Sequence, residues 1–408
     1  MRPFILPLLA CVLALAGACR TPAPGRAAGA PRLARELATP AAPGSGEPNL
    51  ATAADGSMYL TWIEPAGGLG APRHRLMLAR RRPGGEWAPP QRIAEGANWF
   101  VNWADFPSLA VLPDSTLFAH WLERSGSGGY SYGIRVSVSR DGGGTWSAPV
   151  VPHRDGTATE HGFVSFVPWP DGGSGAGRMG MVWLDGRNPE GMRLMSTTID
   201  DHGRLGPEAT LDDRVCDCCQ TAATRTDAGV LVAYRDRSPG EVRDVSVLRT
   251  APAGWTQPQT VGADGWQIHG CPVNGPALAS RGQDAALAWF AAPRDEPRVW
   301  AAFSRDGGAH FGPPVRVDDG KPVGRVDLVL LDDGEALVSW LESAGGRAEL
   351  RVRRVRADGV RGEGLVVAGS SAERSTGFPR MKRAGAEVVV AWRDAADPPR
   401  VRTALIDP

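Results

Sequence analysis

Short apolar strands that end in an aromatic residue recur along the chain, and charged residues follow most of them. Leu60–Glu64, Ala119–Glu123 and Val182–Asp185 are the clearest examples. The aromatic residue stands once every 51 to 62 residues, at Trp62, Trp121, Trp183, Tyr234, Trp289, Trp340 and Trp392. A repeat of this length with strand patterning inside it is typical of a β-propeller. The sequence therefore predicts an all-β fold, a β-propeller of four-stranded blades.

The number of blades follows from the repeats and from the two ends of the chain. Seven aromatic strands predict seven blades, but the last repeat ends after three strands, at Val401–Ile406. An apolar stretch at Leu33–Leu37 could supply the missing strand. The N-terminal segment would then close the ring and cover an exposed sheet edge. Six blades are the alternative, with one repeat as an elaboration.

The N-terminus has the pattern of an export signal. Arg2 precedes an apolar run, Phe4–Ala16, that is too short to anchor a protein in a bilayer. The small residues before Cys19 are similar to a bacterial lipobox, so we predict a signal peptide at 1–18 and a lipid on Cys19. Ordinary secretion is the alternative, since Ala16-Gly17-Ala18 also fits a cleavage site. Residues 19–46 are then a tether and 47–408 the propeller.

Charge and composition limit the partners. The chain has 45 basic and 45 acidic residues, which gives no indication of a nucleic-acid partner or of binding to an anionic membrane surface. No second long apolar stretch follows the signal, so we expect membrane attachment only through the lipid at Cys19. We expect a monomer in the bacterial cell envelope, at the outer membrane if the lipid is present.

Two segments carry a recognisable motif. Ser139-Arg140-Asp141-Gly142-Gly143-Gly144-Thr145-Trp146 matches S-x-D-x-G-x-x-W, and Ser304–Phe311 matches it with Phe in place of Trp. On these motifs the chain resembles the sialidase-like superfamily of BNR-repeat, or Asp-box, propellers. The resemblance implies that these aspartates shape turns, and it implies an exo-α-sialidase-like glycoside hydrolase if the protein is an enzyme. The Phe/Tyr-Arg-Ile-Pro motif of true sialidases is absent.

Strand order predicts which face could carry chemistry. The second strand of each blade ends on the face where the first strands begin, opposite the Asp-box turns. Arginines there could bind an anionic substrate, and carboxylates or a tyrosine could perform hydrolysis. The candidate catalytic residues are Asp185, Arg187, Tyr234, Arg235, Asp236, Arg393 and Asp394, with Glu64, Glu123 and Glu342 in the same ring. The alternative is a solvated rim of salt bridges.

Aromatic residues are predicted near the same face. Trp99, Phe100 and Trp103 lie in the connection into the second blade, and Trp266 lies in the connection into the fifth. Aromatic rings can stack on sugars, so we expect a carbohydrate or small anionic ligand. Two function classes therefore stay open: a glycoside hydrolase, and a non-catalytic propeller that binds a glycan or a protein.

Four cysteines form the most specific feature that this resemblance leaves unexplained. Cys216, Cys218 and Cys219 precede the fourth blade, and His269 and Cys271 precede the fifth. An oxidising compartment favours two disulfides, one of them joining Cys271 to the first group. A Cu(I) or Zn(II) site formed by these five residues is the alternative, and a redox-active dithiol is a third. Otherwise we expect no cofactor.

Overall fold

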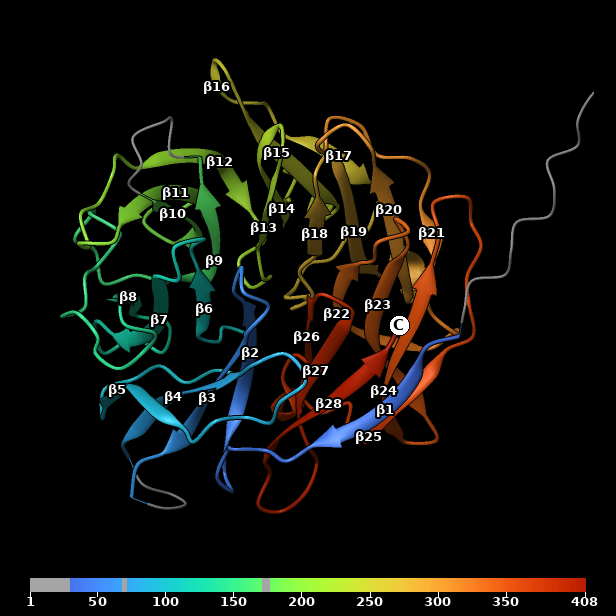
Figure 1. Cartoon of the computed structure of the whole chain (residues 1–408). Coiled ribbons are helices and arrows are strands. Elements are labelled where there is room, and N and C mark those ends of the chain that lie inside the picture. The colour runs from blue at the N-terminus through green and yellow to red at the C-terminus, as the bar shows by residue number, and fades with distance from the viewer. Residues whose placement is uncertain (1–29, 68–71, 171–176) are drawn as a thin grey trace, which may run out of the picture.

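The computed structural model describes residues 30–67, 72–170 and 177–408, which form a ring of seven β-sheets (Figure 1). The seven-bladed β-propeller is confirmed, and the six-blade alternative is wrong. The predicted signal peptide, Cys19 and the tether up to residue 29 lie outside the described residues. In the described ranges, the helical segments η1 (Pro293–Asp295) and η2 (Arg374–Thr376) are single turns, and no helix is long and apolar enough to cross a membrane.

The first three blades follow one another in chain order. Blade 1 contains β2 (Gly46–Thr52), β3 (Met58–Pro65), β4 (His74–Arg81) and β5 (Gln91–Gly96). Blade 2 contains β6 (Ser108–Val111), β7 (Leu117–Arg124) and β8 (Tyr132–Ser139), with a bridge from Val136 to Val150 in place of a fourth strand. Blade 3 contains β9 (His161–Trp169), β10 (Arg178–Asp185), β11 (Met192–Asp200) and β12 (Ala209–Val215).

The remaining four blades continue around the ring. Blade 4 contains β13 (Ala222–Thr226), β14 (Gly229–Arg235), β15 (Val245–Ala251), β16 (Gly254–Trp255) and β17 (Gln259–Gly262). Blade 5 contains β18 (Ala277–Arg281), β19 (Asp284–Ala291), β20 (Arg298–Ser304) and β21 (Val315–Arg316). Blade 6 contains β22 (Pro322–Leu330), β23 (Ala336–Ala344), β24 (Arg347–Val355) and β25 (Leu365–Ser370). Blade 7 contains β26 (Arg380–Ala384), β27 (Glu387–Arg393), β28 (Val401–Asp407) and β1 (Arg32–Leu37).

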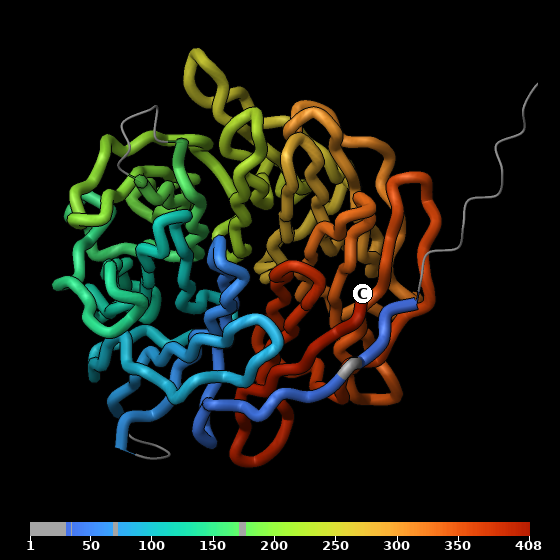
Figure 2. The backbone as a smooth tube through the Cα atoms, viewed as in Figure 1, coloured from blue at the N-terminus to red at the C-terminus, as the bar shows by residue number. Residues whose placement is uncertain are grey.

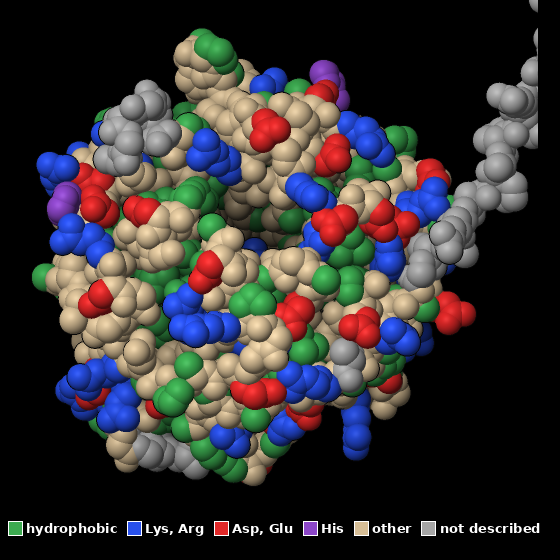
Figure 3. Space-filling model, in the orientation of Figure 1, with side chains coloured by type: hydrophobic (Ala, Val, Ile, Leu, Met, Phe, Trp, Pro, Cys, Tyr) green, Lys and Arg blue, Asp and Glu red, His purple; other side chains and the backbone are tan. Residues whose placement is uncertain are grey.

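Each blade is an antiparallel sheet whose first strand faces the central axis. The first strands of neighbouring blades contact one another around the axis. The space-filling view shows the ring hollowed at its centre (Figure 3). The connections into the first strands therefore gather at one mouth of this hollow, together with the turns between second and third strands. We call this end the mouth face.

The N-terminal strand closes the ring, as predicted. β1 pairs antiparallel with β28, with Leu37 opposite Thr403, so the first and last described strands run side by side (Figure 2). Leu37 is buried with Trp62 of blade 1 and Ala391 of blade 7. Closure in this way covers the edge of β28 and gives the last blade its fourth strand.

Buried indoles fill the space between blades, and most of them have an acidic partner two residues further along the strand. A buried indole N–H needs an acceptor, because an unpaired donor costs about 1–3 kcal/mol. Trp62, Trp121, Trp183 and Trp340 donate to Glu64, Glu123, Asp185 and Glu342 at 2.9, 2.9, 2.8 and 2.6 Å. These four acids of the predicted ring thus have a structural partner.

The two S-x-D-x-G turns lie on the opposite face and have the same hydrogen bonds. Asp141 accepts from the Ser139 hydroxyl at 2.8 Å and from the Thr145 N–H at 2.9 Å. Hydrogen bonds from Thr145 lower the pKa of Asp141 to about 2. Gly143 has a φ of 97°, and a Cβ there would lie 2.6 Å from Leu78, so glycine is required by conformation and by space. Asp306 has matching bonds to Ser304 and His310.

An ion pair across the ring junction gives a test of closure. Arg81, which is 1% exposed, donates two bonds of 2.9 Å to Glu387, so that blade 1 is joined to blade 7. We expect Glu387→Gln to lower the free energy of unfolding by about 1–3 kcal/mol, because the buried guanidinium loses its counter-charge. Urea unfolding measures the change. Asp407→Asn is the matched control, since its exposed pair with Arg32 should contribute less than about 0.5 kcal/mol. Equal effects of the two substitutions would contradict the prediction.

Candidate functional site

A cavity of about 250 Å³ opens on the mouth face between the connections that enter blades 2 to 5 and blade 7. Its walls are aromatic on one side, where Phe100, Trp103 and Phe163 lie. Phe100 and Trp103 belong to the predicted aromatic group. Trp99 and Trp266 instead pack against Trp121 and Phe290. The predicted face therefore contains a cavity with an apolar wall, as ligand sites generally do.

A tyrosine between two carboxyl groups forms the polar end of this cavity. The hydroxyl of Tyr132 lies 2.8 Å from Oδ2 of Asp105 and 2.7 Å from Oε1 of Glu160. The Tyr132 ring is 1% exposed and stacks on Phe100 with 3.9 Å between ring centres. Asp105 is buried behind the tyrosine, whereas Glu160 is only partly buried. Glu160 is thus the member of the group that can reach a bound ligand.

Tyr132, Asp105 and Glu160 together hold one proton in addition to the phenol proton. A phenol has a single O–H, so two short contacts to carboxyl groups require a second proton on one of the carboxyls. Burial raises the pKa of Glu160 to about 7, although its bond to Tyr132 acts in the opposite direction. Burial likewise raises the pKa of Asp105 to about 7. The group therefore gains or loses a proton near neutral pH, as general acids and bases do.

Local backbone structure brings Asp105 to this position. The Asn102 side chain accepts the N–H groups of Ala104 and Asp105, which turns the chain after the aromatic wall. Phe163 has a φ of 55° at a bulge in β9, and its N–H donates to Asp105 at 2.8 Å. A Cβ on Gly162 would lie 1.8 Å from Oδ2 of Asp105, so only glycine permits this approach.

A second carboxylate and two unpaired cations complete the surroundings. Asp217 lines the cavity and accepts bonds of 2.8 and 2.9 Å from Arg237. Arg374 of η2 is exposed at the cavity, and Arg124 lies over the ring of Phe100 at 5.4 Å. Among the described residues, no acidic side chain is within ion-pair distance of Arg374 or Arg124. These two guanidinium groups are free to bind an anionic group.

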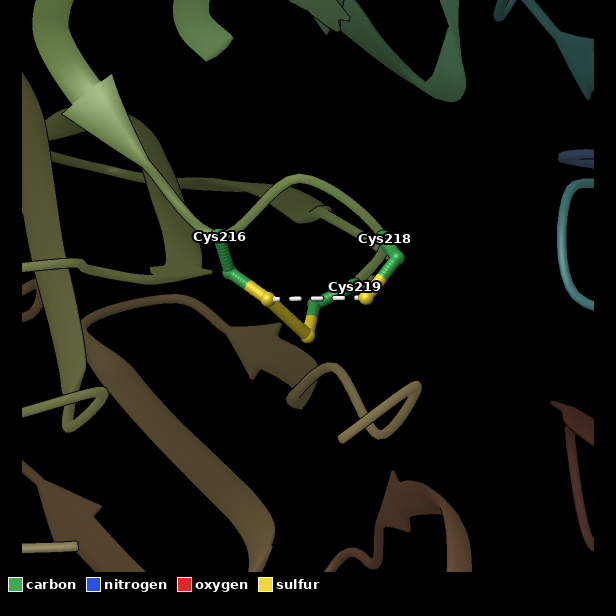
Figure 4. Close-up of side chains that lie close together, drawn as sticks. All are labelled: Cys216, Cys218 and Cys219. Atoms are coloured by element: carbon green, nitrogen blue, oxygen red, sulfur yellow. Dashed lines mark hydrogen bonds between the residues drawn. A yellow bond between two sulfur atoms is a disulfide. The ribbon is translucent and has the colours of Figure 1, made fainter. Parts of the chain in front are cut away.

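The cysteines meet beside this cavity, but they form one disulfide and not two. Cys216 and Cys219 are bridged, and the Cys218 sulfur lies 4.0 Å from that of Cys216 (Figure 4). Cys218 and Cys271 are free thiols that line the cavity. A hydrogen bond from Cys218 lowers the pKa of Cys271 to about 6. The expected bridge to Cys271 is therefore absent, although the two segments do come together.

The predicted metal site at the cysteines is changed by this bridge. A sulfur in a disulfide is a poor metal ligand, so Cys216 and Cys219 leave only two of the four thiols for an ion. His269 is exposed, and it does not belong to the groups of adjacent ligand atoms in the described residues. The remaining pair of free thiols, Cys218 and Cys271, fits best the third prediction, a redox-active dithiol.

The residues predicted to be catalytic lie apart from the cavity, and their side chains have other partners. Asp185 is fully buried and binds Trp183 and Arg187, with two bonds of 2.7 Å to the guanidinium. Tyr234 is 1% exposed and donates to Asp212 at 2.6 Å. Their catalytic role stays a prediction. The contacts that they make in the structure are those of residues that stabilise the fold.

The other predicted residues have similar surroundings. Arg235 is 1% exposed and donates to three backbone carbonyls, those of Asn274, Arg243 and Phe290, and burial lowers its pKa to about 10. The remaining predicted residues bind backbone groups: Asp236 accepts from the Arg237 N–H, Arg393 donates to the Ser375 carbonyl, and Asp394 accepts from the Arg400 N–H. None of these side chains lines the described cavity.

The sequence analysis did not identify Asp105, Tyr132 and Glu160. Tyr132 is one of only four tyrosines and stands at the start of a third strand, directly on the predicted face. Asp105 follows the predicted aromatic group by two residues. These two positions could have indicated a site on the predicted face, but nothing in the sequence alone indicates that Glu160 lies next to them.

Comparison with known proteins supports the fold and nothing finer. No family model and no curated protein matches the sequence. Among solved structures, an ulvan lyase with bound -[GlcA(1-4)Rha3S]- aligns with a TM-score of 0.55 at 12% identity, over 90% of this chain and 95% of that one. The α-L-arabinanase of Penicillium chrysogenum, complexed with arabinobiose, gives 0.51 at 13% identity, over 92% and 98%.

A microbial sialidase, Hadza Hz136, aligns less well, with a TM-score of 0.45 at 17% identity over 73% of this chain and 63% of that one. The resemblance predicted from the motifs stands at the level of a shared propeller fold, without a close match, on the two alignments with TM-scores above 0.5. This chain shares its architecture with propellers that act on glycans, and a shared propeller does not by itself define an activity.

The shared proton predicts a pH dependence of stability. The folded-state pKa values of Asp105 and Glu160, about 7, exceed the usual 3.8 and 4.5, so the protein is stabilised by protonation. This stabilisation is complete below the unfolded-state pKa values and is lost as the pH rises through about 7. We expect stability to fall by about 2–4 kcal/mol between about pH 5 and pH 8, measured by thermal melts.

Asp105→Asn should reduce this pH dependence, because the amide does not titrate, while its oxygen can still accept the Phe163 N–H and its NH2 group can donate to the Tyr132 oxygen. Asp332→Asn, at an exposed carboxylate on the opposite face, is the control and should leave the slope unchanged. Identical slopes in the wild type and Asp105→Asn would show that the group does not hold the extra proton.

The free dithiol predicts selective labelling. Iodoacetamide treatment of the unreduced protein should modify Cys218 and Cys271 and leave Cys216 and Cys219 unmodified, as peptide mass mapping would show. Cys271 should react first near neutral pH, because its pKa of about 6 makes it largely thiolate. A Cys271–Cys218 cross-linked peptide in the fresh protein would restore the two-disulfide prediction.

Proposed function

We propose that this protein is a glycan-active enzyme of the glycoside-hydrolase type, which binds an anionic sugar in the mouth cavity. The observation that carries the proposal is Glu160, a cavity carboxyl whose pKa is raised to about 7 and which lies 2.7 Å from Tyr132. Proton transfer to or from a glycosidic oxygen requires such a group at neutral pH. The similarity of fold to an ulvan lyase and an arabinanase is consistent with a carbohydrate ligand.

The surrounding residues have separate roles in this proposal. Glu160 transfers the proton, Tyr132 held by Asp105 positions it, and burial raises its pKa. Asp217, held by Arg237, is the second carboxylate that hydrolysis of a glycosidic bond requires. Phe100 and Trp103 supply the apolar wall against which a sugar ring packs.

The ligand class follows from the charges at the cavity. Arg374 and Arg124 have no acidic partner among the described residues, so they can bind a carboxylate or sulfate of the sugar. Tyr132 is too deeply buried to attack a sugar itself. The proposed chemistry therefore differs from a tyrosine nucleophile of the sialidase type, which agrees with the absent Phe/Tyr-Arg-Ile-Pro motif.

A binding protein without catalysis is the second candidate. The observation in its favour is that every polar group around Glu160 already has a partner, so that the aromatic wall and the free arginines suffice to hold a ligand. For either function we propose export and attachment to the bacterial cell envelope through Cys19, on the basis of the N-terminal sequence pattern.

Turnover of a glycan panel tests the proposal. The panel contains sialosides, polyuronates, sulfated polysaccharides and neutral arabinan, with detection of new reducing ends and of unsaturated uronate products. Glu160→Gln should lower kcat by about 100-fold or more on the active substrate, because the transferable proton is lost. Arg374→Ala should mainly raise KM for anionic substrates. Asp332→Asn on the opposite face is the control and should behave as wild type.

The outcomes separate the alternatives. Unsaturated uronate products, without new saturated ends, would show that the cavity catalyses elimination and not hydrolysis. Binding without turnover, weakened by Arg374→Ala, would favour the binding protein. Full activity of Glu160→Gln together with its loss in Asp185→Ala or Arg235→Ala would return the site to the residues predicted from the sequence.

A further inference from the structure

Two histidines and an aspartate meet in the connection that leads into blade 3. His153 and Asp155 belong to this connection, and His161 is the first residue of β9. The two imidazole rings stack with 3.8 Å between their centres and an angle of 8°. His161 is fully buried and the side chain of His153 is 8% exposed. This group is separate from the cysteines and from the mouth cavity.

The donor atoms of this group have the spacing of ligands around one metal ion. Oδ1 of Asp155 lies 3.1 Å from Nε2 of His161 and 3.4 Å from Nδ1 of His153. The three ligand atoms all lie within 4.8 Å of one another. Zinc bonds of about 2.0–2.1 Å in tetrahedral geometry place neighbouring ligand atoms about 3.3 Å apart. The spacing of the ligand atoms suits one ion, but the two rings are parallel, so at least one imidazole must turn out of the stack before both in-plane lone pairs can meet it.

Hydrogen bonding leaves His153 unsatisfied. Neither of its ring nitrogens has a hydrogen-bond partner among the described residues, although both are shielded from solvent. Leaving a buried polar atom unpaired costs about 1–3 kcal/mol. A buried imidazole beside a carboxylate and a second imidazole is unusual unless something else binds there, and a cation would satisfy its free nitrogen.

The tautomer of His161 indicates the same kind of ligand. Its Nδ1 lies 3.2 Å from the carbonyl oxygen of Thr159, to which it can donate its proton. With Nδ1 donating to Thr159, Nε2 faces Oδ1 of Asp155 at 3.1 Å, and either a proton or a metal cation between these two atoms satisfies both. Metal-bound histidines commonly donate their other ring N–H to a backbone carbonyl in this way.

The charged neighbours are compatible with a divalent ion. Asp185 lies 3.6 Å from Nε2 of His161 and is bound by Arg187 and Trp183, so it contributes negative charge and is not free as a ligand. Arg187 lies 3.8 Å from Asp155 and is paired with Asp185 and with Glu208. The guanidinium charge is therefore compensated locally by two carboxylates.

We propose that His153, Asp155 and His161 bind one zinc ion, which fixes the connection that carries Glu160. Two imidazoles and a carboxylate are a common zinc ligand set and leave a fourth position for water. Glu160 precedes His161 directly, and its carbonyl accepts the Gly186 N–H at 2.8 Å. An ion at this site would hold Glu160 beside Tyr132. The site does not depend on the proposed enzymatic function.

Metal analysis of the full chain tests this proposal. Protein stripped with a chelator, loaded with zinc chloride and dialysed should retain one zinc per chain by mass spectrometry of the metal. Its melting temperature should rise on loading, because zinc binds the folded state only. His153→Ala and Asp155→Asn should each weaken zinc binding by more than about 10-fold. His202→Ala, an exposed histidine elsewhere in blade 3, is the control and should bind as wild type.

The dithiol could bind zinc as well, so a second variant and a spectrum distinguish the sites. A Cys218→Ser, Cys271→Ser double variant should still retain one zinc. Cobalt(II) at the proposed site should show tetrahedral absorption without a thiolate charge-transfer band. A thiolate band, loss of zinc from the double variant, or no retained metal in the folded wild type would each overturn the proposal.

Discussion

The indole N–H groups buried between the blades impose the constraint on which the rest of the structure depends. These indoles fill the space between neighbouring sheets, and a buried N–H without an acceptor is costly. In four blades the acceptor is an acidic residue two positions further along the same strand, where the strand reaches the mouth face. In blade 5 the acceptor comes from another connection, as Asp264 binds Trp289 at 2.7 Å. Much of the acidic ring that surrounds the mouth therefore has a structural role in the scaffold, and the site that we propose uses side chains outside this repeat.

This division explains which features could be predicted from the sequence. The fold was predictable because an aromatic strand equivalent to those of Trp62 and Trp121 occurs seven times along the sequence. The closing strand was predictable because an incomplete last blade requires a strand such as Leu33–Leu37. The candidate site was not, because Asp185 and Glu160 are equally acidic in sequence and differ only in what surrounds them. Asp105 and Glu160 come from two separate connections and Tyr132 from the start of β8, and their meeting depends on the bulge at Phe163 and on the missing side chain of Gly162. The cysteines show the same limit, since their convergence followed from blade order but their pairing depended on local geometry.

Most of the unusual groups of side chains in this molecule lie near the boundary between blades 2 and 3. The connection from His153 to His161 contributes to both the proposed metal site and the cavity, and the strained turn at Phe163 follows within two residues. The segments that carry Asp217 and Cys218 approach from blade 4. Propellers tolerate such local departures because each blade packs only on its neighbours, so that one interface can be altered while the others keep the ring intact.

Pairing of β1 with β28 also constrains the order in which the molecule can form. Glu36 and Arg402 meet across 366 residues of chain. Six blades can assemble from strands that are close in sequence, whereas the seventh also needs β1, which is synthesised long before its partner β28. Contacts of such long range are slow to form, because closing the intervening loop is entropically costly. β1 therefore stays unpaired while the other blades are made, and during that time its free backbone N–H and C=O groups are open to a wrong partner strand.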